Sequence, residues 1–217
     1  MDTSRFLAEL PNLFDDFPRS RRPRDAGFDE IIASVPNLST ANVLALLNLA
    51  ASLLPAGESY VEVGSYAGAS MLGAMRGNAD ADFVAIDRFG GRGWPGATRR
   101  DFDANLRRFG AHAVTVIEGD AFATLERGGL DERRVGVLFW DADHSLGGQL
   151  RGLRAAERHL AERALVICDN ADWGGVAQAV DDWVGEQPAA CLALALGGRD
   201  GGQPWWHDGL RIVTWQR

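Results

Sequence analysis

One stretch, SYVEVGSYAGAS at residues 59–70, constrains the fold of this chain more than any other. Tyr60–Val63 predicts a short buried strand, Gly64 and Gly68 follow it, and apolar residues return at helical spacing from Ala69. A strand, a glycine-rich turn and a helix in this order leave unpaired backbone N–H groups at the helix start, where glycine lets a ligand approach the main chain. The stretch predicts a corner that binds an anion or a nucleoside.

The spacing of the acid and the glycines limits which ligands this corner can bind. The pattern Glu62-x-Gly64-x-x-x-Gly68 differs from the Gly-x-Gly-x-x-Gly of dinucleotide-binding proteins. The stretch has an acid two residues before Gly64 but lacks the second glycine of the Gly-x-Gly pattern. This combination fits a ligand that has no pyrophosphate at this position.

The rest of the chain alternates predicted strands with predicted helices. The strands are expected at 60–63, 82–86, 113–117, 135–140 and 164–168, and the main helices at 68–76, 99–109, 145–161 and 175–184. This alternation predicts parallel strands with crossover helices. Two final apolar runs, Ala189–Leu196 and Leu210–Trp215, predict a hairpin. The expected class is therefore α/β, a seven-stranded, mostly parallel, doubly wound sheet with a C-terminal antiparallel β-hairpin.

We divide the chain into two predicted parts. Residues 1–57 should form an N-terminal helical cap, which ends in a helix at Ala41–Leu54 with an N-cap at Leu38-Ser39-Thr40. Residues 58–217 should form the ligand-binding domain.

Composition limits the partners. The net charge is −8, which disfavours nucleic acid, and every basic residue is Arg, so no lysine can serve as a base. No apolar run approaches the ~18 residues of a membrane span and no secretory signal is present, so we expect no membrane partner and a cytoplasmic protein. Cys168 and Cys191 lie in apolar runs, which predicts reduced, buried thiols.

Each predicted parallel strand ends in an acid. These strand ends carry Glu62, Asp87, Asp120, Asp141 and Asp169-Asn170. Taken singly, each acid is explained as the N-cap of the next helix. Together they should face one crevice, because ligands of open α/β sheets bind beyond the carboxyl ends of the strands. Crowded carboxylates then need hydrogen bonds or a cation.

Half of this set suits a nucleoside cofactor. Asp87 is placed to accept both ribose hydroxyls, and Asp120 with the backbone of Ala121 is placed at the edge of the base. Ser65 and Ser70 flank the glycines and can bind an amino-acid end of the ligand.

The other half suits a metal ion. Asp141, Asp169 and Asn170 offer hard oxygen donors from neighbouring strand ends, which Mg²⁺ prefers, and two adjacent substrate hydroxyls would complete the coordination. The alternative is that Asp141 and Asp169 only cap helices.

These motifs resemble a known family. The Glu62–Gly68 corner is similar to the first motif of class I, Rossmann-like S-adenosylmethionine-dependent methyltransferases. FWDADH at 139–144 and CDNADW at 168–173 resemble paired motifs of metal-dependent O-methyltransferases of the catechol, caffeoyl-CoA and sugar-modifying natural-product types. The resemblance spans about residues 38–185.

The resemblance implies S-adenosylmethionine and Mg²⁺ or another divalent cation as cofactors. It implies that Asp141, Asp169 and Asn170 hold the metal. The residues expected to contact the methyl donor are Glu62, Gly64, Ser65, Gly68, Ser70, Asp87, Asp120, Ala121 and Asp141.

Two residues are candidates for the catalytic base. His144 falls where the catechol-type enzymes have a lysine, and an imidazole with a pKa of about 6.5 accepts a proton at neutral pH. Asp143 is the rival. His144 can alternatively be a plain residue of the next helix's first turn, capped by Ser145 or Asp143.

The acceptor is expected to be a small molecule with adjacent hydroxyls, such as a catechol or a sugar of a natural product. Trp94, Trp173 and Trp206, the last beside Trp205 and His207, are candidates for the walls of its pocket. Some of these tryptophans can instead cover core edges or form a homodimer contact.

Two rival functions remain open. One is an NAD-dependent oxidoreductase on a similar sheet, which the glycine spacing and the terminal hairpin disfavour. The other is a catalytically inactive nucleoside-cofactor-binding protein, which would be expected to keep the Glu62–Gly68 corner and to lose the metal-binding residues.

Overall fold

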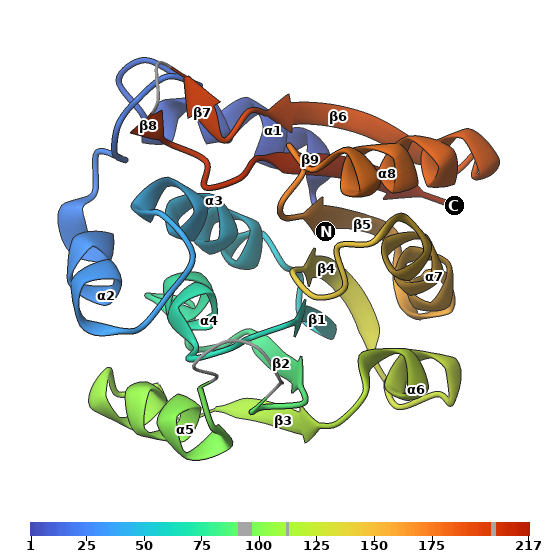
Figure 1. The fold of residues 1–217 in the computed structure, drawn as a ribbon, viewed down its shortest axis with the longest axis horizontal. Helices are drawn as coiled ribbons and strands as arrows, with labels where there is room; N and C mark the ends of the chain where they lie inside the picture. Colours follow the sequence, from blue (N-terminus) through green and yellow to red (C-terminus); the bar gives the residue numbers. More distant parts are fainter. Residues whose placement is uncertain (91–96, 112, 201–202) are drawn as a thin grey trace.

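The computed structural model describes residues 1–90, 97–111, 113–200 and 203–217. Its main element is a seven-stranded sheet in the order β3-β2-β1-β4-β5-β9-β6 (Figure 1). The strands are β1 (Glu58–Val63), β2 (Asp82–Asp87), β3 (Val114–Glu118), β4 (Arg134–Trp140), β5 (Leu160–Cys168), β6 (Ala190–Leu196) and β9 (Leu210–Gln216).

The strand pairing confirms the predicted class. Strands β1 to β5 pair in parallel, whereas β9 runs antiparallel between β5 and β6. A separate two-stranded sheet, β7 (Arg199–Asp200) with β8 (Gln203–Pro204), lies in the connection between β6 and β9. The chain builds outward in opposite directions from the β1–β4 pair, and such a switch point is where α/β sheets bind ligands.

Helices cover both faces of the sheet. Figure 1 shows α3 (Ala41–Ser52), α4 (Ala69–Met75) and α5 (Arg99–Arg108) on one face, and α6 (Ala121–Glu126), α7 (Leu146–Ala156) and α8 (Gly174–Glu186) on the other. Side chains of β1 alternate between the two cores, because a strand has a period of two: Tyr60 packs on the α3 side, and Val61 and Val63 pack on the α7 side.

The first residues pack onto the core that α3 covers. They form α1 (Thr3–Glu9), the 3₁₀ turns η1 (Leu10–Leu13) and η2 (Ala26–Phe28), and α2 (Asp29–Ser34). Phe6, Leu10 and Phe14 are buried in this core. The amino group of Met1 also donates to Glu58 at 2.5 Å, at the start of β1. The predicted boundary at residue 57 stays a prediction.

Two expectations are corrected. The helix predicted to reach residue 161 ends at Ala156, a 3₁₀ turn η3 (Glu157–His159) follows, and β5 begins at Leu160. Strand pairing wins there, because Leu160 is buried and pairs with Val135 of β4. Cys168 is buried as expected, but Cys191 is exposed, because it lies on β6 at the edge of the sheet.

None of the helices in the described residues combines the length and apolar character that a bilayer crossing requires.

The close approach of two strand ends gives a first prediction. Gly64 has a φ of +93°, and a Cβ built on it would lie 1.8 Å from the carbonyl oxygen of Asp141. Gly57 has a similar φ of +85°, with nothing within 4 Å of its Cβ position. We expect Gly64→Ala to lower the free energy of unfolding by more than about 3 kcal/mol, since it adds a clash to the backbone strain.

The matched variant Gly57→Ala should lose only the about 1–2 kcal/mol of a left-handed conformation. Urea unfolding of both variants measures the difference. Equal losses would contradict the importance of the Gly64–Asp141 approach.

Candidate active site

The loops beyond the central strands are held together by backbone hydrogen bonds that extend the sheet. The N–H groups of Gly64, Asp141 and Asp169 donate to the carbonyls of Ile86 (2.9 Å), Val63 (2.8 Å) and Trp140 (3.0 Å). Each bond joins the first residue after one strand to the last or next-to-last residue of its neighbour. The ends of β1, β2, β4 and β5 therefore meet in one crevice at the β1–β4 switch point. Of the predicted acids, Asp87, Asp120 and Asp141 line cavities there, whereas Glu62 and Asp169 are buried.

Glu62 lies at the bottom of this crevice and is fully buried. The hydroxyl of Tyr60 donates to its Oε2 at 3.0 Å, and that of Ser70 donates to its Oε1 at 2.9 Å. Burial raises the pKa of Glu62 to about 7, against the opposing effect of the Ser70, Ser65 and Tyr60 hydroxyls. Glu62 thus ties β1 to the start of α4 and titrates near neutral pH.

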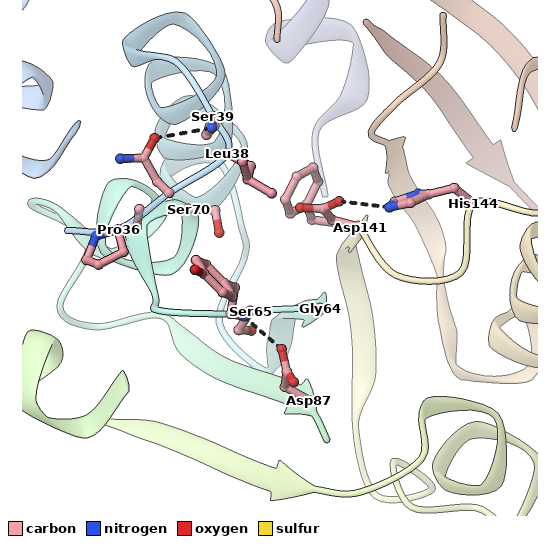
Figure 2. Close-up of a pocket in the computed structure, with 13 residues that line it drawn as sticks. Pro36, Leu38, Ser39, Gly64, Ser65, Ser70, Asp87, Asp141 and His144 are labelled. Atoms are coloured by element: carbon pink, nitrogen blue, oxygen red, sulfur yellow. Dashed lines mark hydrogen bonds and ion pairs between the residues drawn. The ribbon is translucent and has the colours of Figure 1, made fainter. Parts of the chain in front are cut away.

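Asp87 links the loops after β1 and β2. Its two carboxylate oxygens accept the backbone N–H groups of Tyr66 and Phe89, both at 2.7 Å, and Figure 2 shows the first of these bonds. Tyr66 and Phe89 have φ values of +47° and +44°, so both donors sit in left-handed turns. Each Asp87 oxygen retains a second lone pair for a ligand.

Asp120 caps the helix that follows it, which is the alternative role that the sequence left open for each strand-end acid. Its Oδ1 accepts the N–H of Ala123 at 2.7 Å, and Asp120 is the N-cap of α6. Its Oδ2 forms an ion pair with Arg88. Ala121 is the first residue of that helix.

Two cavities open into the crevice. The first, of about 340 Å³, is lined by residues 36–39, by Ser65, Ser70, Asp141 and His144, and by other residues of the β1–α4 loop (Figure 2). The second, of about 330 Å³, is lined by Arg88, Asp120, Ala121, Phe122 and Asp143 among others. Gly64 and Asp87 line both, so the two cavities meet at the ends of β1 and β2.

Asp141 and Asp169 form the acidic centre of the site. The Asp169 side chain is almost fully buried, whereas 27% of the Asp141 side chain is exposed. Burial and the neighbouring Asp169 carboxylate raise the pKa of Asp141 well above its ordinary value. Each carboxylate faces an imidazole: His144 Nε2 lies 3.8 Å from Asp141 Oδ1, and His207 Nδ1 lies 3.7 Å from Asp169 Oδ2.

The predicted metal ligands fit a divalent cation by donor chemistry. Asp141, Asp169 and Asn170 follow the adjacent strands β4 and β5. The two carboxylates repel each other, and this repulsion contributes to the raised pKa of Asp141. A cation bound between them would relieve the repulsion. In the described ranges, no three His, Cys, Asp or Glu side chains converge as a ready-made metal cluster, so the third donor would be the Asn170 amide.

The two candidate bases lie in different cavities. His144 lines the first cavity, where burial lowers the pKa of its imidazole and favours the neutral form that accepts a proton. Its ring meets Trp173 edge-on at a centroid distance of 5.2 Å. Asp143 is exposed, accepts the N–H of Ser145 at 2.9 Å and lines the second cavity. Ser145 caps α7.

The predicted tryptophan walls are only partly assembled. Trp173 packs against His144 of the first cavity but is not itself a lining residue of either cavity. Trp206 does not reach either cavity: it is buried against Phe14 and Phe17, and its indole N–H donates to the carbonyl of Pro18 at 2.7 Å. Trp94 lies outside the described residues.

Residues 36–39 are part of the site that sequence reasoning missed as lining residues. They precede α3, whose N-cap Thr40 was predicted and is observed. The hydroxyl of Ser39 is buried and has no hydrogen-bond partner within the described chain. The predicted N-cap of α3 was the signal that could have found these residues. Helix α3 and helix α4, which follows the glycine-rich loop, both begin at the same edge of the sheet.

A family comparison identifies the central part of the chain. A family model described as a methyltransferase domain matches residues 61–171, which is just over half of the sequence. The match begins within β1, ends just after β5 and includes the loops that follow these strands. A comparison with curated proteins found no match.

Solved structures share the fold. TomG from Streptomyces achromogenes, an O-methyltransferase of tomaymycin synthesis in complex with SAM, is 20% identical, covers 90% of this chain and 92% of its own, and has a TM-score of 0.66. An O-methyltransferase from Bacillus cereus in complex with SAH has 16% identity, coverages of 89% and 92%, and a TM-score of 0.62. CalS11, a TDP-rhamnose 3'-O-methyltransferase of calicheamicin biosynthesis, has 19% identity, coverages of 98% and 93%, and a TM-score of 0.55.

The buried Glu62 carboxyl gives a pH-dependent prediction. Its native pKa of about 7 lies above the ordinary 4.5, so the unfolded chain releases the proton first as pH rises. The stability contributed by this group is full below pH 4.5 and is lost by about pH 7. We expect the stability of Glu62→Gln relative to wild type to rise between pH 4 and pH 8, by up to about 3 kcal/mol.

Urea unfolding of the ligand-free protein across this pH range measures the effect. Glu132→Gln, at an exposed position, is the matched control. A pH-independent difference between Glu62→Gln and wild type would contradict the raised pKa.

Proposed function

The chain belongs to the methyltransferase domain family, and from this premise we propose that it transfers the methyl group of S-adenosylmethionine to a hydroxyl oxygen of a small molecule. The observation that carries the proposal is the pair of cavities that meet at Gly64 and Asp87. A cofactor with a nucleoside at one end and a reactive sulfonium near the other needs such a two-part crevice.

In this proposal the nucleoside occupies the second cavity. Asp87 accepts the ribose hydroxyls with its remaining lone pairs, and Asp120 with the backbone of Ala121 borders the base. The amino-acid end extends past Gly64 toward Ser65 and Ser70, with Glu62 beneath. Gly68, the N-cap of α4, begins the helix that supports this end.

The acceptor then enters the first cavity from the side of residues 36–39. Asp141, Asp169 and Asn170 would hold Mg²⁺ or another divalent cation, which lowers the pKa of a bound hydroxyl and positions its oxygen. An acceptor with adjacent hydroxyls, as in a catechol or a sugar, suits this arrangement. TomG, CalS11 and the Bacillus cereus enzyme are each described as O-methyltransferases, which supports oxygen as the target.

We assign the base to His144 before Asp143. His144 lines the acceptor cavity beside Asp141, whereas Asp143 lines the cofactor cavity and accepts a backbone N–H. In the transfer, the sulfonium S–CH₃ bond breaks, an O–CH₃ bond forms, the electron pair stays on sulfur and the hydroxyl proton passes to His144.

The rival functions are weaker. An oxidoreductase would need a pyrophosphate site, and Tyr66 stands where the Gly-x-Gly pattern of such a site has its second glycine. An inactive binding protein would not need Asp141 and His144 in the lining of the first cavity together with the buried Asp169 near them.

Cofactor binding gives the first test. Calorimetry should show binding of S-adenosylmethionine and of its demethylated product, but no binding of NAD at equal concentrations. The reverse result would falsify the cofactor assignment.

The reactive half gives a second test, scored on acceptors that wild type methylates. His144→Gln should lower the rate by about 10²–10⁴, because it keeps the shape of the side chain and loses the base. Asp143→Asn should stay within a few-fold of wild type. A large loss in Asp143→Asn with a small one in His144→Gln would transfer the role to Asp143.

Metal dependence is scored in the same assay. Asp169→Ala and treatment with EDTA should each abolish turnover while cofactor affinity stays near that of wild type. Undiminished turnover in EDTA would contradict the proposed metal dependence, but it would still be consistent with methyl transfer.

A further inference from the structure

The large apolar side chains that the structure leaves exposed gather at one place. Within the described ranges they are Leu38, Trp173 and Leu146, with exposed fractions of 50%, 49% and 43%. Leu38 lines the first cavity, Trp173 packs edge-on against His144, and Leu146 begins α7 two residues after His144. We call these three side chains the apolar rim.

The rim is assembled from segments far apart in the sequence. Leu38 precedes α3, Leu146 follows β4 and Trp173 follows β5. Figure 2 shows Leu38 facing Asp141 across the cavity. Exposed apolar surface costs free energy in water, and apolar side chains exposed beside a cavity are typical of a ligand-binding site. A bound molecule with an apolar face would cover it.

The charge in the first cavity has one sign. Its lining includes the carboxylates of Asp87 and Asp141 and the imidazole of His144, but no arginine among the described residues. Arg88 lines the second cavity and is paired with Asp120. Phosphate groups are usually recognised by arginine or lysine, so a phosphate in this cavity would lack such a side-chain partner among the described lining residues.

The same cavity contains buried polar atoms that have no hydrogen-bond partner in the described chain. The Ser39 hydroxyl and His144 Nδ1 are buried and make no hydrogen bond within the described chain. A buried polar atom without a partner costs free energy, which a ligand hydroxyl can recover. The cavity thus combines buried polar atoms with the exposed Leu38 in its lining, and Trp173 packs against His144 beside it.

We propose that Leu38, Leu146 and Trp173 determine acceptor specificity, by selecting an uncharged molecule with an apolar face over an acceptor that carries a phosphate. The inference rests on the proposed function, since it names the acceptor class of that site. It separates a free aromatic diol from a sugar nucleotide or a coenzyme A thioester, because only the free diol carries no phosphate.

The test measures binding apart from turnover. The protein is loaded with S-adenosylhomocysteine and Mg²⁺, and calorimetry compares 4-ethylcatechol with the same ring carrying a phosphate ester on its side chain. Wild type should bind 4-ethylcatechol at least about 10-fold more tightly. Trp173→Ala should weaken this binding about 10-fold and leave the affinity for S-adenosylhomocysteine unchanged.

A charge variant supplies a readout that loss of structure cannot mimic. Leu38→Arg places a cation at the rim, so it should reduce the preference for the uncharged ring at least about 10-fold. Ala8→Arg adds the same charge at an exposed position of α1, outside both cavities, and should leave the preference unchanged.

Each outcome separates the two proposals. Equal or tighter binding of the phosphate ester by wild type, an unchanged preference in Leu38→Arg, or no binding of either ring would overturn the rim proposal. Any of these can occur while labelled methyl transfer to another acceptor is still observed. Binding with the expected preference but without transfer of a labelled methyl group to 4-ethylcatechol or any other acceptor would support the rim and overturn the proposed function.

Discussion

The contact between the ends of β1 and β4 is the constraint on which the rest of the site depends. Gly64 comes so close to the carbonyl of Asp141 that no side chain fits between them, and the N–H of Asp141 donates to Val63. This approach brings the glycine-rich loop and the acidic loop into one crevice. With a larger residue at 64 the two loops would separate, and the cavities that share Gly64 would no longer meet.

Buried negative charge is the second feature that organises the site. Burial raises the pKa of Glu62 and favours its uncharged form, whereas the two hydroxyls that donate to it favour its carboxylate. Asp87 and Asp120 are held by backbone N–H groups. Asp169 accepts the backbone N–H of Asn170 at 2.8 Å, and Asp141 and Asp169 each face an imidazole. Most of the carboxylates at the strand ends are thus held by N–H or hydroxyl donors from nearby loops and helices.

Contacts between distant segments hold the chain around residues 36–39 beside the first cavity. Thr40 Oγ1 donates to the carbonyl of Trp205 at 2.9 Å, and Trp206 donates to Pro18, so the terminal hairpin holds the N-terminal segment beside the crevice. The Asp172 carboxylate accepts the N–H of Gly198, which fastens the hairpin to the loop after β5. Residues 36–39 can line the first cavity because these bonds fix them from two sides.

The sequence by itself determined the α/β class, the order of the strands along the chain and the residues at the strand ends, because strand periodicity, glycine spacing and terminal acids are local patterns. It also identified the family, since the Glu62–Gly68 and Asp141–His144 motifs are short and contiguous. Tertiary structure decided which acids cap helices, as Asp120 does, and which remain open to a ligand. It also decided that Trp206 belongs to the core and that Leu38 and Ser39 belong to the cavity. Those assignments depend on burial and on contacts between residues far apart in the chain, and no local pattern encodes either.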